Sequence, residues 1–298
     1  MTEKVLITGL PSLLGTGLIT TAPKRFHLTG TYLTSPPSRL GNTGIKLLPL
    51  NVTEKAAIAE VIQIVKPTII IHLAAVSDID YCQKHRSEAE AVNLAGTRNV
   101  VEAAKKADCY LIFMSSVMVF DGRKGDGYDE EDKPQSLNVY GQTKLAAEEL
   151  VKQSNLKWLI VRLTTLYGWQ PKRARLNPIS WMLNELAADR KLEMVTDRYT
   201  NPIDNLTASK AIWQLIDKKL TGIYHIGGQD VVSRYEWAKA VAGAFGYSTK
   251  LITPVTSGVF TSLAPRPKYA ILKTERIEKA IGYRPPNLVE GLQGMSKK

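Results

Sequence analysis

The fold of this chain is decided near its start by the stretch VLITGLPSLLG, residues 5–15. An apolar strand expected over Val5–Thr8 leads into a turn with glycine at both ends, Gly9 and Gly15, and the small residue Ser12 between them. A dinucleotide-binding turn needs small residues for its tight bend, for approach of the backbone to the pyrophosphate and for packing of the next helix. That helix, expected at 13–22, begins with free N–H groups that attract an anion. A turn without a ligand is the alternative, but its place at the start of a strand–helix–strand pattern favours a cofactor held by Gly9, Ser12, Leu13, Leu14 and Gly15.

Short apolar runs alternate with helical patterns through the first half of the chain. Strands are expected at Val5–Thr8, His27–Tyr32, Ile45–Pro49, Thr68–His72, Tyr110–Ser115 and Trp158–Arg162. Helices are expected between them at 13–22, 54–65, 87–106 and 141–153. This order predicts an α/β fold of the Rossmann type, in which helices cover both faces of a doubly wound parallel sheet.

The pattern changes after Arg162, where prolines become frequent. Helices are still expected at 179–188, 205–217, 233–245 and 273–280, and a strand at Gly222–Ile226 could return to the sheet. We therefore predict an NAD(P)-binding Rossmann domain over 1–165, to which elements near 191–226 return. The remaining residues, 166–298, are expected to form a smaller C-terminal lobe that mainly binds substrate.

Composition and charge narrow the class of protein. The net charge is +11, but the basic residues are scattered without interleaved aromatic residues, which argues against a nucleic-acid partner and favours anionic small molecules. Cys82 and Cys109 belong to no cluster of metal-binding residues, so no metal is expected. The chain starts without a signal-peptide pattern, and its longest apolar run, around 68–76, is too short to span a bilayer. We expect a cytoplasmic protein that does not bind membranes.

The end of the second expected strand indicates which nicotinamide cofactor is preferred. An NAD site usually has Asp or Glu there, which accepts hydrogen bonds from the ribose hydroxyls. This chain has Thr34 and Ser35, with Arg39 nearby and no carboxylate. Hydroxyls and a guanidinium suit a ribose 2′-phosphate, so NADP(H) is favoured over NAD(H).

Tyr140 and Lys144 are four residues apart, which places them on one face of a helix. A free phenol has a pKa of about 10. A neighbouring ammonium lowers that pKa, so that the Tyr can give a proton to a carbonyl oxygen as hydride reaches the carbon. The spacing recurs at Tyr269 and Lys273, but only Tyr140 follows an apolar run that ends in a serine, Ser116, where ligands bind in open α/β sheets. We predict that Ser116, Tyr140 and Lys144 are catalytic and interpret Tyr269 as structural.

Longer motifs surround these residues. Ser115–Gly122 reads SSVMVFDG, which is similar to the pattern STDYVFDG, and Leu137–Lys144 reads LNVYGQTK. Together with the turn at residues 9–15, His72-Leu73-Ala74-Ala75, Gly222-Ile223-Tyr224-His225 and Arg266-Pro267, these motifs resemble the extended short-chain dehydrogenase/reductase superfamily. Within it they resemble the dTDP-4-dehydrorhamnose reductase-like branch, over nearly the whole chain.

The resemblance implies a reaction and a set of roles. The reaction is reduction of a nucleotide-linked 4-keto sugar by NAD(P)H, in which Ser116 orients the carbonyl, Tyr140 donates the proton, and Lys144 lowers the Tyr pKa and holds the nicotinamide ribose. It implies further cofactor contacts from Asn51, Val52, Leu73, Ala74, Ala75, Asn93 and Leu163. It implies substrate contacts from Ser77, Ser116, Val117, Thr165, Asn177 and Arg266.

The sequence also departs from the family pattern. Val117 and Met118 stand where the family has Asp and Tyr, and Thr165 stands where it has Trp. Loss of polar and aromatic groups from a pocket changes substrate choice. Two alternatives therefore stay open: another activity of the superfamily, such as a nucleotide-sugar epimerase, or a non-catalytic regulatory subunit like the β subunit of methionine adenosyltransferase.

Two further expectations concern assembly and the acidic run. The helices at 87–106 and 141–153 often form a dimer face in this superfamily, so a homodimer is expected. The acidic run Asp129-Glu130-Glu131-Asp132 is interpreted as a solvated loop.

Overall fold

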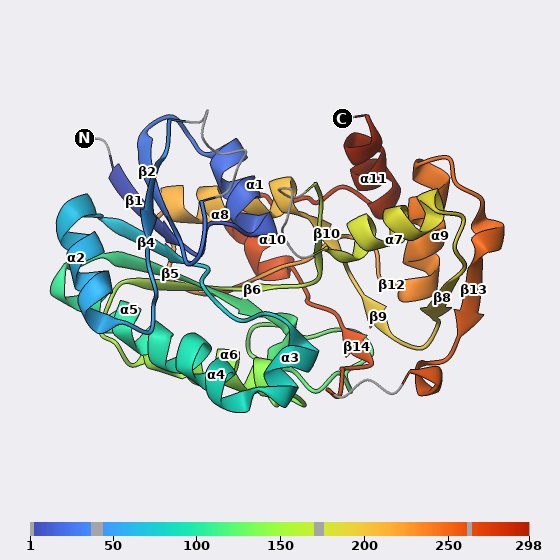
Figure 1. Cartoon of the computed structure of the whole chain (residues 1–298), viewed down its shortest axis with the longest axis horizontal. Helices are drawn as coiled ribbons and strands as arrows, with labels where there is room; N and C mark the ends of the chain where they lie inside the picture. Colours follow the sequence, from blue (N-terminus) through green and yellow to red (C-terminus); the bar gives the residue numbers. More distant parts are fainter. Residues whose placement is uncertain (1–2, 37–43, 170–175, 261–263, 298) are drawn as a thin grey trace.

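The computed structural model describes residues 3–36, 44–169, 176–260 and 264–297. Its centre is a parallel sheet in the order β11-β6-β5-β4-β1-β2-β3 (Figure 1). The strands of this sheet are β1 (Glu3–Thr8), β2 (Phe26–Tyr32), β3 (Lys46–Pro49), β4 (Ile69–His72), β5 (Tyr110–Ser116), β6 (Trp158–Leu163) and β11 (Gly222–Ile226). The predicted doubly wound Rossmann-type sheet is confirmed, and the strand expected at 222–226 forms one edge of it.

Both faces of the sheet are buried, as the uninterrupted apolar runs require. Along β1 the side chains alternate: Val5 and Ile7 join one apolar core, and Leu6 joins the other. Helices α1 (Leu13–Thr21), α8 (Asn205–Asp217) and α10 (Glu275–Ile281) cover the first core. Helices α2 (Lys55–Val65), α5 (Thr97–Lys106) and α6 (Val139–Lys152) cover the second.

The helix expected at 87–106 is divided into three parts. It consists of α4 (Arg86–Glu90), a π-helical stretch η1 (Ala91–Gly96) and α5. A π-helical stretch shifts the hydrogen-bond pattern by one residue and often occurs at a functional site. Helix α3 (Ile79–Lys84), which precedes α4 and packs against α6, was not predicted.

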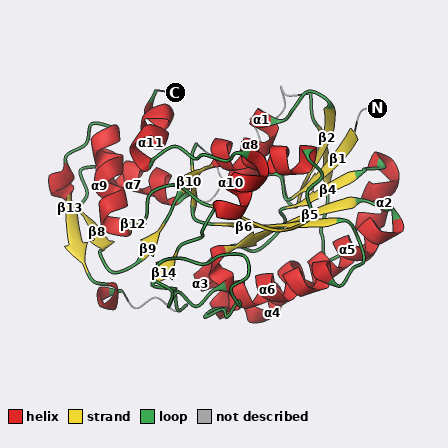
Figure 2. Cartoon of the chain, turned by 180° about the vertical axis from the view of Figure 1, so that it is seen from behind, coloured by secondary structure: helices red, strands yellow, loops and turns green. Residues whose placement is uncertain are grey.

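The second lobe has its own apolar core around the fully buried Trp237 and lies beside the carboxyl ends of the sheet strands (Figure 2). Its helices are α7 (Pro178–Ala187), α9 (Arg234–Ala244) and α11 (Leu288–Ser296). Its strands are β8 (Leu192–Val195) and β13 (Ile252–Val255), which pair in parallel. Short strands lie between the lobes: β7 (Leu166–Tyr167), β9 (Tyr199–Thr200), β10 (Ile203–Asp204), β12 (Val232–Ser233) and β14 (Tyr269–Ala270). The remaining short helices are η2 (Val117–Val119), η3 (Thr249–Leu251) and η4 (Ser257–Val259).

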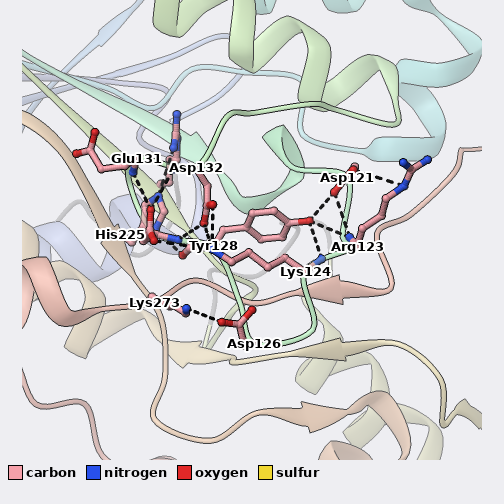
Figure 3. Close-up of polar contacts among 11 residues, drawn as sticks. Asp121, Arg123, Lys124, Asp126, Tyr128, Glu131, Asp132, His225 and Lys273 are labelled. Carbon is pink, nitrogen blue, oxygen red and sulfur yellow. Dashed lines mark hydrogen bonds and ion pairs between the residues drawn. The ribbon is translucent and has the colours of Figure 1, made fainter.

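The acidic run was interpreted wrongly at one position. Glu130 is buried, and its carboxylate accepts a hydrogen bond from the backbone N–H of His225, 2.9 Å away. The preceding residues, 121–128, are held together by Tyr128. Its hydroxyl donates to Asp121 and accepts from the backbone N–H of Arg123 (Figure 3). Within the described ranges, no helix has both the length and the apolarity needed to cross a membrane.

Candidate active site

The cofactor turn lies at the point where the strand order of the sheet reverses. β1 is flanked by β2 and β4, and ligands of open α/β sheets bind beyond the strand ends at such a point. Gly9 follows β1 with φ +68°, and a Cβ built on it would lie 2.5 Å from the Cα of Ala74. The loop after β4 is held there because Leu73 N donates to Thr8 O at 3.1 Å. Gly9, Leu73 and Ala74 are therefore brought together, and only glycine fits at residue 9.

The start of α1 has the local structure that an anion site requires. The Ser12 side chain caps the helix by accepting from Gly15 N at 3.0 Å. A Cβ on Gly15 would lie 2.2 Å from the carbonyl oxygen of Leu10, so a larger residue would displace the turn. The three small residues at 9, 12 and 15 thus fit a nucleotide cofactor, which would approach this helix start.

The other residues expected to contact the cofactor differ in their exposure and in their contacts. Thr34 and Ser35 are exposed beyond β2, as a phosphate contact requires, whereas Arg39 lies outside the described residues. Asn51 is already used locally: its side-chain oxygen accepts from Thr53 N at 3.1 Å. Ala75 is half-buried beside Ala74, and Val52 and Leu163 are buried.

Asn93, which is expected to contact the cofactor, makes several hydrogen bonds within the protein. It lies in the π-helical stretch and is 1% exposed. Its side chain accepts from Val76 N at 2.8 Å and donates to Val76 O and to the Thr143 hydroxyl, each at 3.0 Å. It therefore fixes the loop after β4 against α6, one residue before Lys144.

Tyr140 lies in the first turn of α6, which begins two residues earlier than predicted. The cause is Asn138, whose side chain accepts from Gly141 N at 2.9 Å and donates to Pro265 O at 3.0 Å. Val139 N donates to the side chain of Gln83 in α3 at 3.1 Å. Three segments that are distant in sequence thus meet at the turn that carries Tyr140.

Ser116 and Lys144 complete the predicted group from β5 and from the next turn of α6. Ser116 ends β5, and its hydroxyl interacts with the Tyr140 phenol. Lys144 is 4% exposed, and its ammonium lies over the ring of Phe113, 4.1 Å from the centroid. The structure therefore gathers Ser116, Tyr140 and Lys144 at the carboxyl end of β5, where the sequence placed them.

The protonation of this group differs from expectation. Burial raises the pKa of Tyr140 to about 12, and the hydrogen bond from Ser116 opposes that rise. Burial lowers the pKa of Lys144 to about 7, and the carboxylate of Glu148 opposes that fall. The rise of the Tyr140 pKa is opposite in direction to the expected lowering, because burial disfavours the charged phenolate.

The residues of the second Tyr–Lys pair, interpreted as structural, make contacts within the protein. The Tyr269 ring stacks on Tyr199 with the centroids 5.5 Å apart. The Lys273 ammonium lies 2.7 Å from the carboxylate of Asp126 (Figure 3).

On the substrate side, Arg266 lies next to the start of α6. Its guanidinium forms a bidentate ion pair with Asp80 of α3, with distances of 2.6 and 3.0 Å. Arg234 begins α9, and its pKa is lowered to about 10 by burial and then by the positive charges of Arg266 and Arg198. Arg198, Arg234 and Arg266 are thus close enough to affect one another electrostatically, although the charge of Arg266 is balanced by Asp80.

The remaining predicted substrate residues are placed less directly. Val117 is 2% exposed and packs in an apolar cluster with Phe120 and Tyr128. Asn177 uses its side chain to cap α7 and to donate to Gly168 O at 2.8 Å. Ser77 is exposed in the loop after β4, and Thr165 is half-buried after β6.

Sequence reasoning missed Arg198, Arg234 and a buried ion pair between Glu148 and Arg162. Two signals were available. A cation in the first turn of a helix, as at Arg234, is unfavourable beside the positive end of the helix dipole. A charged residue within an apolar strand, as at Arg162 in WLIVRL, has to find a buried partner.

Comparison with known proteins identifies the family. Residues 3–298 match the family described as RmlD substrate binding domain. The dTDP-4-dehydrorhamnose reductase of Aggregatibacter actinomycetemcomitans is 29% identical over 258 residues, which cover 83% of this chain and 86% of the relative. Methionine adenosyltransferase 2 subunit beta of Bos taurus is 29% identical over 291 residues, which cover 95% and 84%. The crystal structure of dTDP-4-dehydrorhamnose reductase from Bacillus anthracis in complex with NADP matches with a TM-score of 0.87 and 29% identity, and 99% of each chain is covered. Since the family match spans almost the entire sequence, this chain belongs to the RmlD substrate binding domain family.

Proposed function

We propose that the chain is an NAD(P)H-dependent reductase of a 4-keto sugar linked to a nucleotide. The observation that carries this proposal is the convergence of Ser116 and Tyr140 at the carboxyl end of β5, with Lys144 one turn further along α6. Similarity to dTDP-4-dehydrorhamnose reductases over most of the chain supports the substrate class. We further propose that residues 1–165, with the elements near 191–226 that return to them, bind the cofactor, and that residues 166–298 mainly bind the sugar substrate.

In the proposed reaction, the bound cofactor supplies a hydride to the carbonyl carbon. The hydroxyls of Ser116 and Tyr140 donate hydrogen bonds to the carbonyl oxygen, and Tyr140 then transfers its proton to that oxygen. The Lys144 ammonium stabilises the phenolate that remains, which matters because burial otherwise disfavours it. Lys144 is buried and Tyr140 is half-buried, which limits the access of water to the proton.

The direct test is oxidation of NADPH, followed at 340 nm, by purified protein with a dTDP-linked 4-keto sugar. Tyr140→Phe is expected to lower kcat by about 10²–10⁴-fold, the usual contribution of a general acid. Tyr269→Phe is the matched control, because it removes the same hydroxyl from the second Tyr–Lys pair. Equal activity of the two variants would refute the assigned role of Tyr140.

The anionic part of the substrate is assigned to the arginines between the lobes. Guanidinium groups suit a diphosphate, and Arg234 lies near Arg266, which Asp80 holds in place by an ion pair. Arg234→Met is expected to raise the KM for the nucleotide sugar at least tenfold and to leave NADPH affinity unchanged. A KM that stays within twofold would remove Arg234 from the site.

The cofactor proposal is a preference for NADP(H) over NAD(H). It rests on exposed hydroxyls at Thr34 and Ser35 and on the absence of a carboxylate at that strand end. Fluorescence titration with both reduced cofactors tests the preference, and tighter binding of NADH would overturn it.

Regulation of a methionine adenosyltransferase is the second candidate function. It is favoured by the similarity to the β subunit of methionine adenosyltransferase 2, which extends over 95% of this chain. Co-elution with a methionine adenosyltransferase catalytic subunit, with no turnover of any keto sugar, would support this function over the first.

A further inference from the structure

A buried ion pair lies behind the helix that carries Tyr140 and Lys144. Glu148 of α6 is 0% exposed and Arg162 of β6 is 1% exposed. The pair is bidentate: Arg162 Nη2 lies 2.7 Å from Glu148 Oε2, and Nε lies 3.0 Å from Oε1. Burial of two charges has a large desolvation cost that their attraction offsets only when the geometry is good. Such a pair is a poor source of stability, so its placement calls for another explanation.

The Glu148 carboxylate also binds the strand that carries Ser116. Ser115 Oγ donates to Glu148 Oε1 at 2.5 Å, and Ser115 directly precedes Ser116. One carboxylate therefore joins the end of β5, the end of β6 and the second half of α6. These elements carry Ser116, Tyr140 and Lys144.

The guanidinium extends the connection to the loop after Ser116. Arg162 lies 5.1 Å from the ring centroid of Phe120, and its Nη1 is 3.4 Å from His225 Nε2. Phe120 stacks on Tyr128 with the centroids 4.1 Å apart, and His225 Nδ1 lies 3.2 Å from the carbonyl oxygen of Tyr128 (Figure 3). Burial and the Arg162 charge lower the pKa of His225 to about 3, so it is neutral near pH 7.

Glu148 is also the anion that acts on Lys144. The two residues are one turn apart on α6, and both are buried. His72 of β4, also near Lys144, is kept neutral because burial and the Lys144 charge lower its pKa to about 3. Tyr140 is a neutral phenol, and Arg162 adds positive charge behind Glu148. Among the described charged groups around Lys144, Glu148 is therefore the one that favours the ammonium, in addition to the Phe113 ring over which the ammonium lies.

We propose that Glu148 and Arg162 are positioning residues, which fix α6 against the ends of β5 and β6 and set the charge of the Lys144 side chain. The kinetic half of this inference rests on the proposed reductase function, whereas the electrostatic half does not. Removal of the Glu148 carboxylate makes the Lys144 ammonium lose its proton more easily. Removal of the Arg162 guanidinium makes that ammonium harder to deprotonate.

The experiment compares Glu148→Gln with Glu149→Gln. Glu149 is the neighbouring exposed carboxylate, which pairs only with Lys152 at 2.8 Å among the residues the structure describes. The Lys144 titration is read from the ¹³Cε chemical shift of labelled lysine, assigned by its loss in Lys144→Met. We expect Glu148→Gln to lower the Lys144 titration by at least about one pH unit, because an opposite charge one helical turn away commonly shifts a pKa by that amount. Arg162→Met should raise it, and Glu149→Gln should leave it unchanged.

Glu148→Gln alone leaves a guanidinium buried without its partner, so the double variant Glu148→Gln/Arg162→Met is measured as well. It removes the buried guanidinium together with its carboxylate partner, so no unpaired arginine remains. Its Lys144 titration should fall between those of Glu148→Gln and the parent, because the nearer charge dominates. Identical Lys144 titrations in the parent, the double variant and any folded single variant would overturn the proposal.

The kinetic readout separates positioning from simple stabilisation. For those variants of Glu148 and Arg162 that fold, we expect kcat to fall at least tenfold and the KM for the sugar to change less than twofold. The alkaline limb of their pH profile should follow the Lys144 titration. A lower Tm with an unchanged pH profile would overturn the positioning role. If the parent reduces no keto sugar yet Glu148→Gln still shifts Lys144, the proposed function fails and the electrostatic inference stands.

Discussion

Replacement of Asn138 by Ala tests how the turn carrying Tyr140 is held. Asn138 is 1% exposed and makes two hydrogen bonds with its side chain, one to Gly141 N and one to Pro265 O. Loss of a helix N-cap costs about 1 kcal/mol. Loss of the second bond, which leaves the Pro265 carbonyl unpaired, costs about 1 kcal/mol more. We therefore expect Asn138→Ala to lower the free energy of unfolding by about 2 kcal/mol.

The change in melting temperature follows from chain length. An unfolding entropy of about 2.1 cal/mol/K per residue gives about 0.6 kcal/mol per degree for 298 residues. Asn138→Ala should thus lower Tm by about 3 °C in differential scanning calorimetry. It should also lower kcat, because Tyr140 follows the cap by two residues.

Two comparisons isolate the contributions. Asn287→Ala removes the N-cap of α11, far from the site, and should cost only about 1 kcal/mol with kcat unchanged. Asn138→Asp keeps the accepting oxygen but loses the donor to Pro265, so its stability should fall between those of Asn138→Ala and the parent. If Asn138→Ala is no less stable than Asn287→Ala and has the parent's kcat, the hydrogen bonds of Asn138 do not hold the turn that carries Tyr140.

Three further predictions follow from contacts, burial and surface. Gly141→Ala should cost more than about 2 kcal/mol because its Cβ would lie 2.0 Å from Met118 O, whereas Gly243→Ala in α9, with open space around it, should be stabilising by up to about 1 kcal/mol in urea unfolding. Burial lowers the pKa of both His72 and His225 to about 3, so the unfolded chain binds more protons between pH 6.5 and 3. Stability should therefore fall with decreasing pH in that window, by up to about 1.4 kcal/mol per pH unit for each histidine; an unchanged acid slope in a folded His72→Asn variant would contradict this. The helices over 86–106 and 139–152 are proposed as a dimer face, so light scattering should give twice the chain mass, and a monomer would exclude it.

Much of the first half could be predicted because its signals are local. Apolar strands of β-branched residues alternate with amphipathic helices, and that order alone implies a parallel sheet. The position of Tyr140 was predicted for the same reason, since it follows a strand that ends in a serine and stands at the start of a helix. The predicted start of α6 was two residues too late. Its N-cap, Asn138, is recognised only from its hydrogen bonds in the folded chain.

The failures arise where distant residues decide the outcome. Glu130 looked solvated because it stands in an acidic run, but His225, 95 residues later in the chain, provides the N–H that it accepts from. Likewise, nothing in the pattern of 87–106 announces the π-helical stretch, in which Asn93 reaches the loop at Val76 and Thr143 of α6. The lowered pKa of Lys144 depends on burial, which spacing along a helix does not report.

The edge position of β11 has a consequence for the order in which the chain folds. After β6, the polypeptide leaves the sheet, builds α7 and β7 to β10, and returns through α8 to add β11 beside β6. During synthesis, one edge of β6 therefore stays unpaired until residue 226 has left the ribosome. The side of α1 that packs against α8 likewise stays uncovered until α8 has been made. An open strand edge invites pairing with other chains. The central sheet is therefore completed only after α7 and β8 of the second lobe have been synthesised, whereas α9, β13 and α11 of that lobe follow β11 in the chain.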